Sequence, residues 1–150
     1  MPAGAWKVYG TAVEKIGRNT LDLDAGQYRM VLLTSAYTPN QNTHSTFADI
    51  SAAQVTGTGY TANGKLITQA VSRSSLVTTF DCDDQSWTSS TITAKYAAIV
   101  RDVNSDGTIA STDDLLCYCD LETGGGSLST TAAAFTVTIN ASGVFALTAT

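Results

Sequence analysis

Residues 102–113 form a stretch whose residue types and spacing could bind a metal ion. Calcium prefers carboxylate and carbonyl oxygens, and a twelve-residue calcium loop supplies them from positions 1, 3, 5, 7 and 12, with glycine at position 6. Gly107 stands at position 6, and Ile109 can anchor the loop to a core. The candidate ligands at the other positions are Asp102, Asn104, Asp106, the carbonyl of Thr108, and Asp113. The spacing therefore predicts a candidate calcium (Ca²⁺) site.

The surroundings of this loop support a second interpretation. The loop is similar to those of cellulosomal dockerin modules, in which aspartate also stands at position twelve. That resemblance implies two paired loops, each followed by a helix, whereas this chain has a single loop that follows a predicted strand. Read without a metal, Asp106-Gly107 is a turn at the polar tip of a hairpin. Both interpretations stay open at the level of the sequence.

Residues 43–49 carry the side-chain types of a hydrolase, namely Thr43, His44, Ser45 and Asp49. A Ser-His-Asp triad requires the fold to bring the three groups together, with the serine presented on a sharp turn. The sequence contains no G-x-S-x-G motif, and neighbouring positions in one loop do not create that geometry. We therefore expect no catalytic residues and no enzymatic activity.

A glycine-rich stretch, residues 57–65, partly matches a phosphate-binding loop. Gly59 and Gly64-Lys65 meet the G-x-x-x-x-G-K spacing, but Leu66 stands where that motif needs a serine or threonine. No helical pattern follows. Residues 62–64, Ala-Asn-Gly, instead predict a hairpin turn.

The three cysteines are Cys82, Cys117 and Cys119, and an odd number argues against a disulfide framework. Cys117 and Cys119 are two residues apart and would share one face of a strand. We expect each to behave as a small buried apolar group.

The composition favours a β-rich chain and excludes some partners. Charged residues make up 14% of the 150 residues, against about 25% in typical domains. The net charge is −5 and the basic residues are scattered, which argues against nucleic acid, since that partner needs a clustered positive face. No apolar run approaches the ~18 residues that span a bilayer, and no signal-peptide pattern opens the chain. We expect a product of the cytoplasm with no membrane partner.

The loop should be positioned by the strand before it. In residues 87–101 the side chains alternate from Thr91 onward, with period two. One face is apolar throughout and the other becomes apolar near the end, so a central position in a sheet is predicted. The apolar face consists of Ile92, Ala94, Tyr96, Ala98 and Val100.

Other segments complete a β fold. Residues 6–16 show a helical stripe that Gly17 would cap, with a strand over residues 6–9 as the alternative. The predicted strands are residues 28–33, 76–80, 115–121 as a return arm of the 87–101 strand, and a C-terminal hairpin of 135–139 with 144–148. We expect one mainly β, antiparallel β-sandwich-like domain over residues 1–150, with one short N-terminal helix. A barrel is the open alternative.

Several stretches taken together resemble a family of small structural proteins of tailed bacteriophages. The resemblance covers most of residues 6–121 and rests on the order and spacing of the stretches. These are WKVYGTAVEKIG, TLDLDAGQYRMVLLTSAYTPN, GTGYTANGKL, WTSSTITAKYAAIV and DLLCYCDL. The 102–113 insert exceeds the family pattern.

The resemblance implies a virion protein without catalytic positions, most simply a head decoration or cement protein. Its expected partners are the major capsid protein or other virion proteins, and a homo-oligomer is the natural form, because weak contacts repeated over a lattice give durable attachment. One alternative is a tail or baseplate component that binds host glycan, with Trp6, Trp87 and tyrosines stacking on sugars. Another is a calcium-dependent interaction module.

Overall fold

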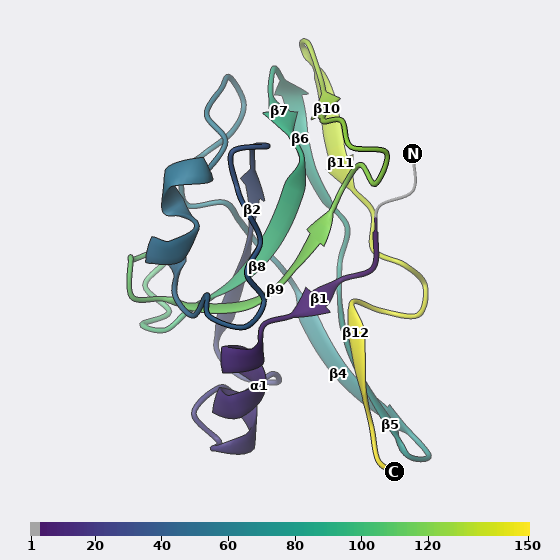
Figure 1. Ribbon diagram of the computed structural model, residues 1–150. Coiled ribbons are helices and arrows are strands. Elements are labelled where there is room, and N and C mark those ends of the chain that lie inside the picture. Colours follow the sequence, from purple (N-terminus) through teal and green to yellow (C-terminus); the bar gives the residue numbers. More distant parts are fainter. Residues whose placement is uncertain (1–3) are drawn as a thin grey trace.

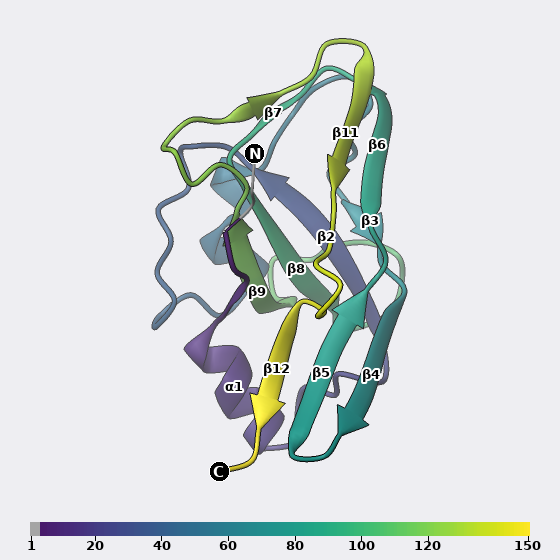
Figure 2. The same cartoon turned by 90° about the vertical axis from the view of Figure 1, so that its right-hand side faces the viewer.

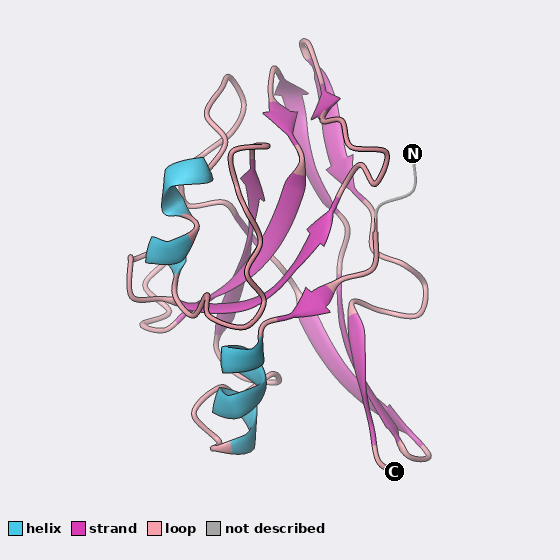
Figure 3. Cartoon of the chain, viewed as in Figure 1, coloured by secondary structure: helices cyan, strands magenta, loops and turns pink. Residues whose placement is uncertain are grey.

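Over residues 4–150 the protein is mainly β with one α-helix, and its strands pair antiparallel (Figures 1 and 3). The computed structural model describes residues 4–150. The elements are β1 (Lys7–Val8), α1 (Gly10–Gly17), β2 (Gln27–Leu33), two 3-10 turns (Phe47–Asp49 and Ser51–Ala53), β3 (Lys65–Leu66), β4 (Gln69–Ser74), β5 (Val77–Cys82), β6 (Gln85–Ser90), β7 (Thr93–Ala94), β8 (Tyr96–Asp102), β9 (Asp114–Asp120), β10 (Leu128–Ser129), β11 (Ala133–Val137) and β12 (Phe145–Thr148). The predicted antiparallel, sandwich-like β fold is confirmed.

The main sheet has five strands in the order β1-β9-β8-β2-β3. β8 lies at its centre, hydrogen-bonded to β9 and to β2, with Ile99 opposite Cys117 on one side and Met30 on the other. Ala97, Ala98, Ile99 and Val100 are fully buried, because this strand is covered on both faces. The sequence correctly predicted β8 as central, β2 as buried and β9 as its return arm.

The prediction of one long strand over residues 87–101 was wrong, because this segment contributes to three strands in different sheets. Trp87 belongs to β6, which pairs with β11, whereas Ala94 belongs to β7, which pairs with β10. Ser89 has φ 51°, outside the extended region, and Thr91 bridges to Thr58 instead of continuing β6. The chain therefore changes partner strands twice over this segment, from β11 to β10 and then to β9 and β2, and the alternation from Thr91 onward does not show the second change.

A second layer consists of a three-stranded sheet, β12-β5-β4, and the pair β11-β6. Figure 2 shows β4, β5 and β12 in front of the strands of the main sheet, with β5 leading into β6. The predicted C-terminal hairpin was also wrong, since β11 and β12 do not pair with each other. β12 lies along β5, with Phe145 opposite Phe80, and β11 lies along β6.

One hydrophobic core joins the two layers. Tyr28 of β2 meets Phe80 of β5 edge to face, with ring centroids 5.8 Å apart, and Phe80 stacks on Phe145 at 5.2 Å. Trp87 packs against Phe135 on the neighbouring strand. Buried residues of β2, β5, β6, β8, β9 and β11 belong to this core, and the partly buried Val71 of β4 and Phe145 of β12 pack against it. The contact of two sheet faces through such side chains defines a sandwich-like arrangement.

Helix α1 begins at Gly10, after the short strand β1, so the helix and strand interpretations of residues 6–16 were each right for part of the segment. The expected cap at Gly17 was wrong. The left-handed residue is Asn19, with φ 57°, and the amide of Thr20 donates to the carbonyl of Lys15. This is the Schellman arrangement, in which asparagine can replace glycine.

None of the helices in residues 4–150 combines the length and apolar character that crossing a membrane requires.

Candidate functional site

The 102–113 loop connects β8 to β9, so the predicted ligands stand at the tip of a central hairpin. Asp102 and Asp113, at the two ends of the loop, are each only 1% exposed. Charged carboxylates are rarely buried to this extent unless they are paired.

Backbone amides of the loop itself pair with these two carboxylates. Asp102 accepts hydrogen bonds from the amides of Asp106 (3.3 Å) and Gly107 (2.9 Å). Asp113 accepts from the amides of Val103 (3.1 Å) and Ala110 (2.8 Å). The two aspartates therefore hold the loop closed from inside, because each satisfies amides that make no strand ladder.

The other candidate ligands face solvent. Asn104 and Thr108 are exposed, and Asp106 accepts hydrogen bonds from the hydroxyl (2.6 Å) and amide (2.9 Å) of Thr108. Those two bonds hold the pKa of Asp106 below its usual value. Gly107 has φ 85°, the left-handed conformation that the sharp turn requires, and Ile109 packs against the core as predicted.

The structure thus places all five candidate ligands in one ordered hairpin loop. Among residues 4–150, however, no three acidic, histidine or cysteine side chains gather as a metal-binding group. The oxygen atoms that could bind calcium lie in two places. Those of Asp102 and Asp113 are buried, and those of Asn104, Asp106 and Thr108 belong to exposed residues of the loop.

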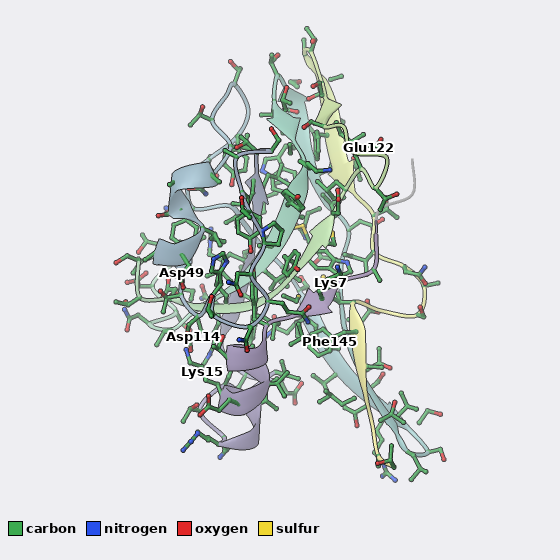
Figure 4. All side chains as sticks on the ribbon, in the orientation of Figure 1. Lys7, Lys15, Asp49, Asp114, Glu122 and Phe145 are labelled. Carbon is green, nitrogen blue, oxygen red and sulfur yellow. The ribbon has the colours of Figure 1, made fainter. Side chains whose placement is uncertain are left out.

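Residues 43–49 are arranged as a structural turn. Asp49 accepts hydrogen bonds from the amides of Ser45 (2.8 Å) and Thr46 (3.0 Å), which lower its pKa. The Nδ1 atom of His44 lies 3.2 Å from the hydroxyl of Tyr37. The hydroxyl of Ser45 accepts from Lys15, which also forms an ion pair with Asp114 at 2.5 Å (Figure 4). The three groups of the hydrolase pattern therefore have separate partners.

The glycines of residues 57–65 serve close chain packing. A side chain on Gly57 or Gly59 would collide with the backbone near Thr91 and Ser90, and one on Gly64 would collide with the carbonyl of Met30. Residues 61–64 form a turn into β3, which pairs with β2. Close backbone approach is a common reason for glycine in a β fold.

The three cysteines are buried and unpaired. Burial raises the pKa of Cys82 and of Cys119 to about 12, and raises that of Cys117 as well. They are therefore small core groups, as expected.

Surface grooves are the features that the sequence did not reveal. One groove of about 780 Å³ lies between residues 4–6 and residues 138–146. A second, of about 530 Å³, is lined by residues that include Lys7, Tyr96, Tyr118 and Asp120. The residues that line each groove come from opposite ends of the chain or from different strands, so no local sequence motif could predict the grooves.

Only one of the two tryptophans considered for sugar stacking can reach a ligand. Trp87 is 2% exposed and lies in the core. Trp6 is half-buried, packs against the core and lines the larger groove. The prediction that Trp87 could stack on a sugar was wrong, because its ring is buried in the core.

Comparisons of the chain with protein-family models, with curated proteins and with solved structures found no match.

Proposed function

We propose that this chain is a structural protein of a bacteriophage virion, a head decoration protein that acts by contact with the capsid. The observation that carries the proposal is the order and spacing of the stretches over residues 6–121 that resemble small phage structural proteins. A decoration protein needs an ordered domain with surfaces available to neighbours that symmetry repeats many times.

The end of the three-stranded sheet offers one such surface. Leu76, in the β4–β5 turn, is 63% exposed, and Leu147 on β12 is 38% exposed. These two side chains line a common shallow groove of about 400 Å³ together with Arg73. β4 and β12 are both edge strands of this sheet, so their outer sides have no partner strand within it. Exposed apolar groups beside unpaired edges suit contact with another protein.

Co-sedimentation with phage heads and tails, separated from the parent particle, tests this function. We expect the purified chain to sediment with heads depleted of it and to remain in the supernatant with tails. The double variant Leu76→Asp/Leu147→Asp should lose at least about tenfold in affinity, because it places charge in the contact. Leu66→Asp is the matched control, since Leu66 is 52% exposed but lies on β3 of the other sheet. Binding to tails alone would support the tail or baseplate alternative and overturn the proposal.

Calcium binding by the 102–113 loop is a second proposal, supported by the ligand spacing and by the ordered closure of the loop. Calcium should raise the melting temperature of the wild-type chain relative to a sample with chelator, because a ligand that binds only the folded state stabilises it. Asp106→Ala should remove this rise, and its exposed position makes it a gentler change than one at Asp102 or Asp113. Asp24→Ala, another exposed aspartate, serves as the control. Equal melting temperatures with calcium and with chelator would contradict the proposal.

A further inference from the structure

We infer that the groove between residues 4–6 and residues 138–146 is a binding site for a neutral saccharide. This inference does not depend on the proposed attachment to a phage head. The groove has a volume of about 780 Å³, within the range of ~300–1,000 Å³ that small-molecule sites occupy.

Aromatic rings lie on both walls of the groove. Trp6 stands on the N-terminal wall, half-buried and packed against the core, so that its ring is held in place. Phe145 stands on the opposite wall and stacks on Phe80. Figure 4 labels Phe145 on β12 and Lys7 on β1, the residue that follows Trp6 in the sequence. Rings fixed in this way offer flat apolar faces to the C–H groups of a sugar ring.

The polar groups of the rim are hydroxyls and an amide. Thr138, Asn140 and Ser142 are exposed and line the groove. The Oδ1 atom of Asn140 accepts from the amide (2.9 Å) and the hydroxyl (2.7 Å) of Ser142. That arrangement orients the side chain, and within residues 4–150 its amide nitrogen has no hydrogen-bond acceptor. An oriented amide with free donors can bind sugar hydroxyls.

The charge of the groove selects the class of ligand. Of the lining residues within 4–150, none is charged, although the chain as a whole carries −5. The smaller groove differs, since Lys7 and Asp120 line it. An anionic ligand would lose its hydration in the larger groove without meeting a positive charge among the described lining residues, and a carboxylate beside that wall, that of Asp84, accepts from the amide of Ile139 at 2.7 Å. A neutral polar ligand loses less, and its hydroxyls find partners on the rim.

Both walls are fixed before a ligand arrives. The amide of Gly4 donates to the carbonyl of Asp120, which ties the first wall to the end of β9. On the second wall Gly143 has φ 88° and its backbone lies against Thr79 and Phe80, where any side chain would collide. A preformed site loses less conformational entropy on binding.

The shape of the second wall argues against a protein segment as the occupant. A docked strand needs a continuous unpaired edge along which to form a hydrogen-bond ladder. Here the wall consists mainly of the irregular connection between β11 and β12, residues 138–144, which contains the Asn140–Gly143 turn. Only Phe145 and Ala146 of β12 extend it. A short ring-shaped ligand fits this surface better than an extended chain.

Nuclear magnetic resonance titration of the full chain tests the site. The probes are maltose, cellobiose, lactose and N,N′-diacetylchitobiose at up to about 20 mM, with sialyllactose as the charged comparison. We expect at least one neutral saccharide to shift the indole N–H signal of Trp6 and the side-chain amide of Asn140 saturably. The indole of Trp87 should not shift, because that ring is buried in the core.

A pair of matched variants separates the groove from the rest of the surface. Ala146→Phe, which fills the groove at an exposed position, should weaken binding at least about tenfold, a change of about 1.4 kcal/mol. Ala70→Phe makes the same exchange at an exposed position of β4 outside the groove and should leave the affinity unchanged.

The inference would be overturned by the absence of a shift with any neutral saccharide, by equal affinity for sialyllactose, or by full binding by Ala146→Phe. Shifts of the same signals with phage heads and with no saccharide would assign the groove to a protein partner and also overturn it. Saccharide binding without head binding would leave the inference standing while the proposed function fails.

Discussion

At the scale of residues, burial decides which polar groups are free to do chemistry. Asp102 and Asp113 are buried because backbone amides of their own loop satisfy them, and His44, Ser45 and Asp49 each have structural partners. The sequence correctly identified the turn at Gly107 and the anchor at Ile109. It could not show which carboxylates would be buried, because that depends on how β8 and β9 converge at the loop.

The three cysteines give a prediction at this scale. A pKa of about 12 leaves roughly one thiol in ten thousand ionised at pH 8, and only the thiolate attacks a disulfide reagent. We expect the native chain to react with Ellman's reagent far more slowly than the unfolded chain, in which all three thiols react. Ser74→Cys, at an exposed position of β4, provides a reactive thiol for comparison. Native cysteines that react as fast as this added thiol would contradict the buried placement.

At the scale of elements, the accuracy of the sequence predictions depended on whether the pairing was local. The β8–β9 hairpin was predictable, because its strands are apolar on both faces and one loop joins them. β2 was predictable as a buried strand from its apolar residues alone, although its partners β3 and β8 lie further along the chain. β11 and β12 were misassigned as a hairpin. Asn140–Gly143 does form a turn, but the partner strands are β6 and β5, whose paired residues lie between 43 (Ser90 to Ala133) and 71 (Val77 to Thr148) positions away along the chain. Residues 87–101 were misassigned because alternation of side chains does not reveal that the chain passes to another sheet between Ser90 of β6 and Thr93 of β7.

The turn before β3 gives a prediction at the element scale. Gly64 has φ 57°, and a side chain there would collide with the carbonyl of Met30 on β2. Gly64→Ala should therefore lower the free energy of unfolding by about 2–4 kcal/mol, from backbone strain together with the collision. Gly107→Ala is the control, since Gly107 is also left-handed but has open space around it, and should cost only about 1–2 kcal/mol. Urea denaturation measures the free energy of unfolding of both variants. Equal losses for the two would contradict the predicted collision between a side chain at position 64 and β2.

At the scale of the whole molecule, the fold is an ordered body with one groove whose described lining is uncharged and with an exposed sheet end. Its two layers share one core, and its polar surface relies on hydroxyl groups more than on charge. Such a body suits attachment by many weak contacts, in which the strength comes from repetition over a lattice. The saccharide groove and the end of the three-stranded sheet involve different residues, so one molecule could use both at once.

An electron-microscopy map of the parent particle tests the central proposal most directly. The proposed function predicts density matching this two-layered β domain at many symmetry-related positions on the outside of the head. Density for the domain only at the tail or baseplate, or its absence from the particle, would contradict a decoration role.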